Sequence, residues 1–252
     1  MNYPDDFIDQ IICGDCLEVM KEIPDKAVDM ILCDLPYGIT ACEWDTVIPF
    51  EPLWEQYERV IKDNRAIVLT ATQPFASALI MSKPDWYKHE WIWDKVRPSG
   101  FQIAKYKPMQ RHEHVLVFSK KGKRLNYFPI MESRDKPITR KVYGRSDSSP
   151  LAYSDGRKRT YTNKYPQSIL KYNKPLKSLH PTQKPIDLLE YLIKTYTNEG
   201  DLVLDNCMGS GSTGVAAINT NRKFIGIELE QNYFDIAKNR IIEAIKQKDG
   251  EV

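Results

Sequence analysis

The sequence lacks a long hydrophobic segment, because none of its apolar runs approaches the roughly 18 to 20 residues that span a bilayer. Its opening residues, MNYPDDFIDQ, are acidic and polar, so we expect neither a signal peptide nor a membrane anchor. The 5 cysteines, an odd number, indicate free thiols in a reducing compartment rather than a disulfide framework. A chain of 252 residues can form one large domain, with or without an insertion.

The spacing of the cysteines does not favour a redox site or a zinc site. Cys13 and Cys16 form a C-x-x-C pair, as in redox proteins, but a redox role leaves the motifs described below unexplained. Cys33, Cys42 and Cys207 provide no second close pair, so we expect no metal site such as zinc. No cysteine follows a proline, which excludes the Pro-Cys nucleophile of enzymes that methylate carbon 5 of cytosine.

Positive charge is concentrated in residues 120–177, which hold 16 Lys and Arg but 4 Asp and Glu, a balance of +12. The net charge of +2 therefore leaves −10 for the rest of the chain. A solvated loop would explain a short charge run, but here the cations alternate with the aromatic residues Tyr127, Phe128, Tyr143, Tyr153, Tyr161, Tyr165 and Tyr172. Cations beside aromatic rings suit phosphates and bases. The candidate nucleic-acid contacts are Arg140, Lys141, Arg145, Arg157, Lys158, Arg159 and Lys164.

Short apolar runs alternate with helical patterns over most of the chain. The predicted strands are 9–13, 28–33, 66–71, 88–93, 114–118, 201–205 and 223–228, and the predicted helices are 50–62, 74–83, 186–197 and 231–247. This alternation predicts an α/β fold with a seven-stranded, mostly parallel, doubly wound sheet. Residues 120–177 have no sustained period, so we expect an insertion that is partly mobile without its partner. The predicted domains are therefore 1–119 with 178–252, and the basic insertion 120–177.

A glycine-rich loop follows the predicted strand that ends at Asp205. Gly209, Gly211 and Gly214 form G-x-G-x-x-G before a helix of small residues, a spacing that lets a ligand approach the backbone. A tight turn without a ligand and an NAD site are alternative interpretations. However, no lysine follows the glycines, Asp205 would attract a cation, and Glu228 can accept hydrogen bonds from a ribose. A cationic ligand with a ribose and no phosphate fits S-adenosylmethionine.

The order of elements separates this chain from a usual dinucleotide-binding fold. Only one predicted strand, 223–228, follows the glycine loop. The remaining strands must come from the N-terminal half, so the sheet is circularly permuted relative to the usual cofactor-first order.

The stretch CDLPYG, residues 33–38, places a carboxylate directly after a strand. An exocyclic amino group on a base is a poor nucleophile, because its lone pair is delocalised into the ring. Two acceptors, the Asp34 carboxylate and the Leu35 carbonyl, can take its N–H groups, and Pro36 restricts that carbonyl. Tyr37 can stack on the base, which must be flipped out of a duplex to reach such a site. As an isolated feature, Asp34 could also be a plain turn residue.

Together these motifs resemble the amino-methylating DNA methyltransferases, which produce N6-methyladenine or N4-methylcytosine and carry an Asp/Asn/Ser-Pro-Pro-Tyr motif. The resemblance covers nearly the whole chain except 120–177, and the order of motifs is similar to that of the family's β group. It implies a permuted Rossmann-like catalytic domain, S-adenosylmethionine as cofactor, duplex DNA as substrate and 120–177 as the target-recognition region. It further implies cofactor contacts from CGDCLEVM (Asp15, Cys16), HPTQKP (His180, Thr182, Lys184) and the glycine loop (Asp205, Gly209, Gly211).

The resemblance also favours adenine, because family members with Asp in the catalytic motif mostly modify adenine and those with Ser mostly cytosine. It implies a bacterial or phage-encoded cytoplasmic enzyme, with a cognate restriction endonuclease and a homodimer as further expectations. Two departures from the family pattern, Leu35 for proline and Asn206-Cys207 for Pro-Phe, suggest slower turnover or weaker cofactor binding.

Other functions are compatible with parts of this pattern. They are N4-cytosine methylation, methylation of RNA, protein or a small molecule, and DNA binding by a homologue with a degenerate catalytic site. His112 and His114 flank Glu113 on a predicted strand, and we expect them at the strand surface or facing DNA rather than binding a metal.

Overall fold

The computed structural model describes residues 2–38, 45–122, 124–146, 149–175 and 183–250, without the side chains of 143–155. It divides into two compact units, one formed by Met1–Phe128 with Ser168–Val252 and the other by Pro129–Gln167. Among the described residues, no helix is both long and apolar enough to cross a membrane.

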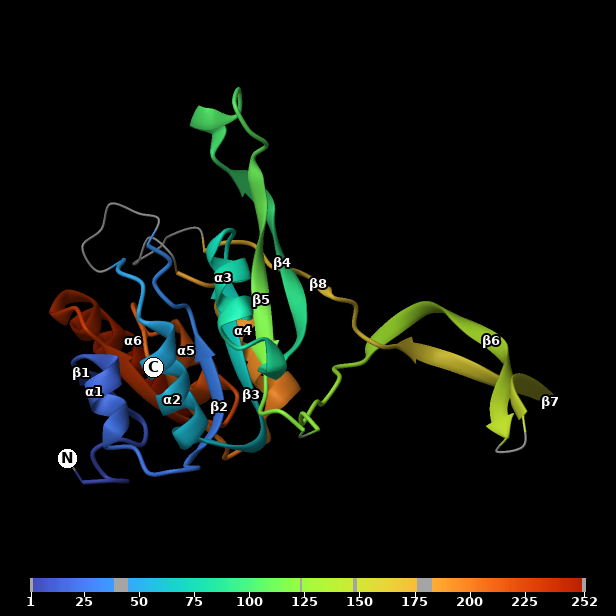
Figure 1. Ribbon diagram of the computed structural model, residues 1–252, viewed down its shortest axis with the longest axis horizontal. Coiled ribbons are helices and arrows are strands. Elements are labelled where there is room, and N and C mark those ends of the chain that lie inside the picture. The colour runs from blue at the N-terminus through green and yellow to red at the C-terminus, as the bar shows by residue number, and fades with distance from the viewer. Residues whose placement is uncertain (1, 39–44, 123, 147–148, 176–182, 251–252) are drawn as a thin grey trace. The chain divides into compact units, whose positions relative to one another are not determined.

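The first unit is built on an eight-stranded sheet (Figure 1). In order across the sheet, the strands are β1 (Gln10–Cys13), β10 (Lys223–Glu228), β9 (Leu202–Asp205), β2 (Val28–Cys33), β3 (Ile61–Ala71), β5 (Gln110–Phe118), β4 (Tyr87–Ser99) and β8 (Ile169–Lys171). All neighbouring pairs are parallel except β3–β5 and β5–β4. The predicted α/β fold with a mostly parallel sheet is confirmed.

The predicted number of strands is wrong by one, because β8 adds an eighth strand at the edge beside β4. This strand lies inside the segment that the sequence analysis assigned to the insertion. It has three residues, and only Leu170 among them is buried. A segment of this length shows no hydrophobic alternation, so its strand character depends on pairing with β4.

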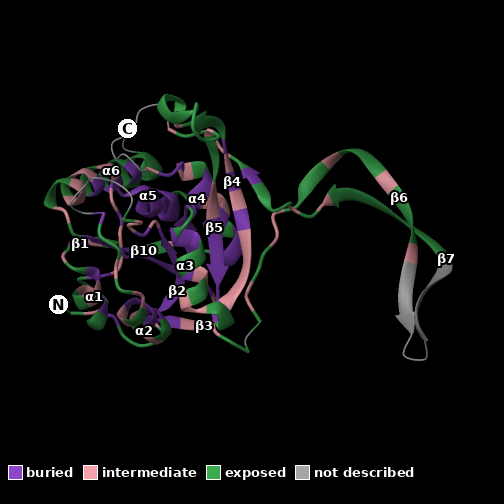
Figure 2. Cartoon of the chain, turned by 45° about the horizontal axis from the view of Figure 1, so that its top comes forward, coloured by how far each residue is buried: buried purple, intermediate pink, exposed green. Residues whose placement is uncertain are grey.

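Helices cover both faces of the sheet. On one face lie α1 (Cys16–Lys21), α2 (Phe50–Val60) and α3 (Phe75–Ser82), and on the other lie α4 (Ile186–Tyr196), α5 (Ser212–Asn219) and α6 (Gln231–Asp249). Successive residues of a central strand serve different faces, since Ile31 packs with α1–α3 and Leu32 with α4–α6. The strands are therefore buried on both sides, as Figure 2 shows, which explains their continuous apolar runs.

The strands β4 and β5 form an antiparallel pair that is longer than the sequence predicts. β4 continues to Ser99 and β5 begins at Gln110, and the connection contains the short 3-10 helix η2 (Phe101–Ile103). A second 3-10 helix, η1 (Pro84–Trp86), leads into β4. The outer part of this hairpin projects beyond the other strands in Figure 1. Its root carries residues that reach the site described below.

The second unit is a two-stranded antiparallel ribbon of β6 (Glu132–Ser146) and β7 (Ser149–Lys164). The sequence analysis assigned no strand to this segment, and its partial mobility without a partner stays a prediction. Among the ribbon residues whose side chains are described, none is buried, so no apolar face marks these strands in the sequence.

Candidate active site

A cavity of about 590 Å³ lies in the first unit, where the carboxyl ends of β1, β2, β3, β9 and β10 meet. Ligands in open α/β sheets bind at this edge, because loops from several strands converge there. The catalytic candidates Asp34, Leu35, Pro36 and Tyr37 all line the cavity. The structure therefore brings the DLPY stretch and the glycine loop, about 170 residues apart in sequence, to one cavity.

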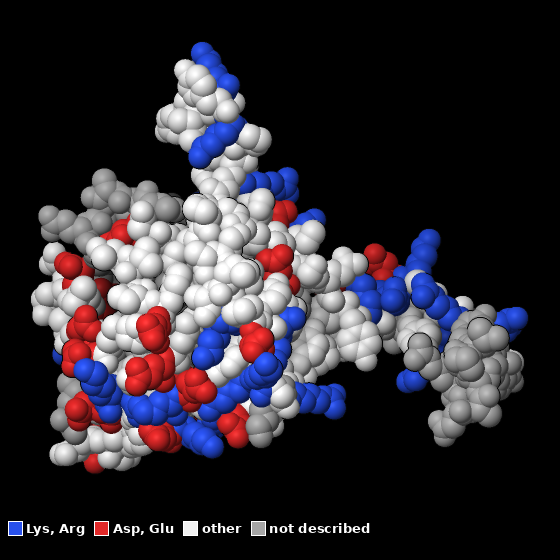
Figure 3. Space-filling model, in the orientation of Figure 1, with Lys and Arg blue, Asp and Glu red and all other residues white. Residues whose placement is uncertain are grey.

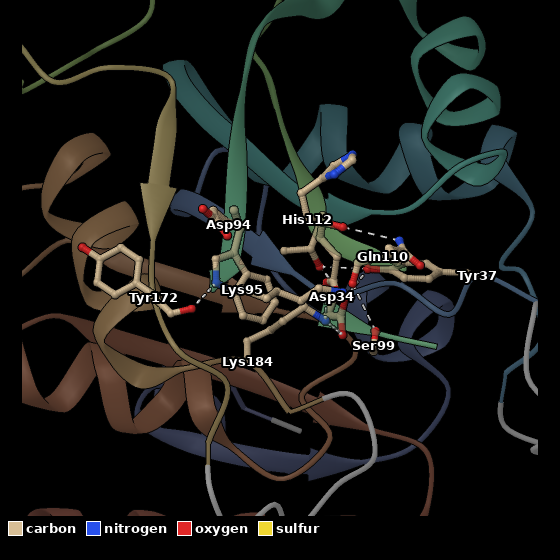
Figure 4. Close-up of polar contacts among 12 residues, drawn as sticks. Asp34, Tyr37, Asp94, Lys95, Ser99, Gln110, His112, Tyr172 and Lys184 are labelled. Carbon is tan, nitrogen blue, oxygen red and sulfur yellow. Dashed lines mark hydrogen bonds and ion pairs between the residues drawn. The ribbon is translucent and has the colours of Figure 1, made fainter. Parts of the chain in front are cut away.

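The Asp34 carboxylate is held by three neighbours (Figure 4). Its Oδ1 accepts hydrogen bonds from the Tyr37 hydroxyl at 2.5 Å and from the Thr70 hydroxyl. Its Oδ2 accepts from the Lys184 ammonium. Asp34 is thus fixed before any base arrives, and it lines the cavity together with Leu35 and Pro36.

Tyr37 supports Asp34 in this structure. Its hydroxyl also lies 3.2 Å from Thr70 Oγ1, and its ring centroid is 5.1 Å from that of Phe75. Burial, together with the charges of Asp34 and Glu113, raises the pKa of Tyr37, so the hydroxyl stays a donor. The stacking role expected for Tyr37 stays a prediction.

The turn after DLPY is held by Asp45. The backbone N–H groups of Tyr37 and Gly38 both donate to Asp45 Oδ1, at 2.8 and 2.9 Å. Gly38 has a φ of 68°, a left-handed conformation that favours glycine. Asp45 therefore fixes the backbone that presents Asp34 and Tyr37 to the cavity.

Lys184 was expected at the cofactor, but the structure brings it to the catalytic carboxylate. Its Nζ pairs with Asp34 Oδ2 and lies 3.6 Å from Glu113 Oε2. Burial alone would lower the pKa of Lys184, but the charges of Asp34 and Glu113 more than offset it, and that pKa is raised. The other oxygen of Glu113 pairs with Lys95 Nζ at 3.1 Å. Four charged side chains thus alternate in sign beside the cavity.

The glycine loop wraps the carboxylate at the end of β10. Glu228 accepts from the Gly209 N–H at 2.6 Å and from the Glu230 N–H at 2.9 Å, and burial raises its pKa. Gly209 and Glu228 both line the cavity. Gly211 is not among the lining residues, and a side chain there would lie 2.9 Å from Ala237 Cβ. Gly211 therefore allows α5 to pack closely against α6, and its cofactor contact stays a prediction.

Asp205 is a buried carboxylate at the mouth of the glycine loop. It accepts from the Cys207 N–H at 3.1 Å, and burial raises its pKa to about 6. Among the described residues, no Lys or Arg forms an ion pair with it. A buried anion without a cationic partner suits a ligand that carries positive charge.

The predicted contacts near β1 also lie at the cavity. Asp15 caps α1, accepting from the Leu17 and Glu18 N–H groups at 2.8 and 3.3 Å, and Cys16 begins that helix. Both line the cavity. His180 and Thr182 lie outside the described residues.

The Asn206-Cys207 departure from the family pattern has a local explanation. The Asn206 side-chain oxygen accepts from the buried Tyr57 hydroxyl at 2.6 Å. Its amide nitrogen donates to Cys207 Sγ at 3.5 Å. Asn206 therefore satisfies a buried hydroxyl from α2 that a proline could not.

The DNA-contact candidates all lie on the β6–β7 ribbon. Arg140 pairs across the strands with Arg159, and Lys141 pairs with Lys158. Directly opposed like charges destabilise a two-stranded ribbon unless an anion compensates them. The Arg157 side chain is exposed, Lys164 pairs with Glu132 at 2.7 Å, and the side chain of Arg145 lies outside the described part of the chain. Figure 3 shows the Lys and Arg side chains along this ribbon.

Sequence reasoning missed four residues of the site: Asp45, Thr70, Lys95 and Glu113. Thr70 lies at the end of a predicted strand, a position that could have marked it. Glu113 lies between His112 and His114, and the sequence analysis assigned a position to the two histidines but no role to Glu113. Strand alternation turns Glu113 toward Lys95 and Lys184, whereas His112 points away from Lys184 and Asp34 (Figure 4).

The residues that line the cavity have the chemistry that S-adenosylmethionine requires. It offers a buried anion, Asp205, for a sulfonium, and a second carboxylate, Glu228, for a ribose diol. Its volume is within the range of small-molecule sites.

Comparison with known proteins gives the following similarities. A family model described as DNA methylase matches residues 28–239. The type II methyltransferase M.HinfI of Haemophilus influenzae is 30% identical over 265 residues, covering 94% of this chain and 69% of the relative. The crystal structure of the M1.HpyAVI–SAM complex is 28% identical, with a TM-score of 0.61, covering 92% of this chain and 98% of that chain. The PvuII DNA methyltransferase (cytosine-N4-specific) has a TM-score of 0.63 at 14% identity, covering 94% and 91%, and shows the fold alone.

Proposed function

Because this chain belongs to the N6/N4 DNA methylase family, and is an S-adenosylmethionine-dependent DNA methyltransferase, we propose that it methylates the exocyclic N6 of adenine in duplex DNA. The observation that carries the proposal is the Asp34 carboxylate, fixed by three donors at the wall of the cofactor cavity.

In this proposal, Asp34 and the Leu35 carbonyl accept the two N–H groups of the flipped base. Their pull localises the lone pair on the amino nitrogen. The negative charge of Asp34 also stabilises the positive charge that develops there. When bound, S-adenosylmethionine supplies the methyl group. Positioning and electrostatics therefore provide most of the catalysis.

We assign the cofactor contacts to the cavity residues. Asp205 faces the positive charge of the cofactor and Glu228 its ribose, while Asp15, Cys16 and Gly209 form the neighbouring wall. His180 and Thr182 are retained from the family motif, on the resemblance alone. Lys184 contributes from the catalytic side, through Asp34.

The β6–β7 ribbon is proposed to contact the DNA backbone near the target. Support comes from its opposed cations at Arg140–Arg159 and Lys141–Lys158, which a polyanion would neutralise. An aromatic ring accompanies them, since the Arg159 guanidinium lies 5.5 Å from the Tyr161 ring centroid. Similarity to a type II methyltransferase supports pairing with a cognate restriction endonuclease. A homodimer stays a prediction.

The choice of adenine rests on Asp34 rather than on the fold, because a cytosine-N4-specific enzyme has a similar fold. The test is to methylate duplex DNA with the purified protein, digest it to nucleosides and identify the methylated product by mass spectrometry. We expect N6-methyladenine. N4-methylcytosine as the sole product would overturn the choice of base and leave the reaction class intact.

A further inference from the structure

A row of four charged side chains leads from the β4–β5 hairpin to the catalytic carboxylate. Lys95 Nζ lies 3.1 Å from Glu113 Oε1, Lys184 Nζ lies 3.6 Å from Glu113 Oε2, and Lys184 pairs with Asp34. The side chains of Lys95, Glu113 and Lys184 are 3%, 12% and 7% exposed. All four line the same cavity. Water therefore screens these charges poorly, and each of them strongly affects how the others pair.

The ion pair between Lys184 and Asp34 opposes the proposed role of Asp34 in the reaction. Positive charge develops on the amino nitrogen of the base while Asp34 accepts its N–H group. A lysine ammonium on the same carboxylate weakens the negative potential that stabilises that charge. Lys184 is buried, so it cannot move to bulk water without leaving the wall of the cavity.

Glu113 provides the alternative partner. Its Oε2 is buried and accepts no hydrogen bond from the described residues, although the Lys184 ammonium is 3.6 Å away. A shift of less than 1 Å would bring that contact to ordinary hydrogen-bond length. Lys95 holds the other oxygen of Glu113 at 3.1 Å, which leaves Oε2 to face Lys184.

We propose that Glu113 is a positioning residue that takes the Lys184 ammonium from Asp34 when the amino group of the target base enters. Asp34 then presents an anion to the reacting nitrogen, while Lys184 stays paired and buried. Lys95 keeps the row neutral, because two lysines face two carboxylates throughout. The inference rests on the proposed role of Asp34. It adds a residue of the antiparallel hairpin to the catalytic arrangement.

The test compares Glu113→Gln with the wild type in the full-length protein. The methyl-transfer rate is measured in single turnover with labelled S-adenosylmethionine and plasmid DNA that the wild type methylates. Affinities for cofactor and DNA are measured by calorimetry and by fluorescence anisotropy. We expect the rate to fall about 10- to 100-fold, with both affinities within about 3-fold of wild type. A merely structural residue would not separate rate from affinity in this way.

Glu90→Gln is the matched control, because Glu90 lies on β4 of the same hairpin and pairs with His114 at 2.8 Å outside the cavity. It should leave the rate unchanged. Glu113→Asp keeps the charge but shortens its reach, so its rate should lie between those of wild type and Glu113→Gln. If Glu113→Gln does not fold, the Asp variant decides, and a wild-type rate in it overturns the proposal.

A wild-type rate in folded Glu113→Gln overturns the inference, and so does a rate loss matched by an equal loss of cofactor or DNA affinity. Both results leave the proposed function standing if the wild type methylates DNA and Asp34→Ala does not. If the wild type itself did not methylate DNA, the proposed function would be wrong.

Discussion

The carboxylate of Asp205 has a protonation equilibrium that the fold shifts strongly. Burial raises its pKa to about 6 from an ordinary 3.8. A raised pKa means that the folded state binds the proton more tightly than the unfolded state. The contribution of Asp205 to the stability of the folded state is therefore fully present below about pH 4 and is lost as the pH rises through 6.

Replacing Asp205 with Asn should therefore stabilise the protein without cofactor at high pH. The gain over wild type should approach roughly 3 kcal/mol at pH 8 and vanish below pH 4, while cofactor affinity falls. Urea unfolding at both pH values measures this. Asp201→Asn is the control, because Asp201 pairs with Arg65 at 2.8 Å and its loss should destabilise at pH 8. An equal effect of Asp205→Asn at both pH values would contradict the buried-anion interpretation.

Individual residues were predictable where chemistry and chain position coincide. Asp34 follows β2 directly and Asp205 ends β9, and parallel strands bring their carboxyl ends to one edge. Asp45 and Glu113 were not predictable in this way. Asp45 acts through hydrogen bonds from the backbone of Tyr37 and Gly38, and Glu113 acts through the antiparallel pairing that aligns β5 with β4. The spacing of residues in the sequence does not reveal either of these tertiary contacts.

At the scale of elements, the helices were easier to predict than the ribbon. In the predicted helix 50–62, helical spacing places Leu53, Trp54 and Tyr57 on one stripe, and α2 buries all three. None of the described side chains of the β6–β7 ribbon is buried, so periodicity could not reveal it. β8 was missed for a related reason, since pairing with β4 rather than its own sequence makes it a strand.

The ribbon provides the prediction that belongs to this scale. Lys141 and Lys158 oppose each other across the strands, and each is expected to neutralise a phosphate. Changing both to Gln should reduce the slope of log affinity for DNA against log salt by up to roughly 2. Cofactor affinity should be unchanged.

Anisotropy titrations with duplex DNA over a range of salt concentrations measure that slope. Lys238→Gln with Lys246→Gln is the matched control, because it removes the same charge from α6 of the other unit. An unchanged slope in the ribbon variant, or an equal reduction in the control, would argue against the ribbon as a DNA contact.

At the scale of the whole molecule, the order of the strands in the sheet explains why one cavity holds both the catalytic stretch and the cofactor loop. β2 carries the catalytic stretch early in the chain, and β9 and β10 carry the glycine loop and Glu228 near its end. β9 lies between β10 and β2 in the sheet, so the two motifs become neighbours. The chain order separates catalytic and cofactor motifs, and the sheet order joins them.

The central claim is that Asp34 acts on the reacting amino nitrogen rather than on cofactor binding. Asp34→Ala removes the acceptor, and Asp34→Asn keeps an oxygen toward Tyr37 and Thr70 but removes the charge. The decisive measurement is the single-turnover rate of methyl transfer to duplex DNA, with cofactor affinity measured on the same samples. We predict that Asp34→Ala lowers the rate by roughly 10²–10³-fold or more, that Asp34→Asn falls in between, and that both bind cofactor almost as wild type does. Full methyl transfer by Asp34→Ala, or a rate loss explained by lost cofactor binding, would contradict the account.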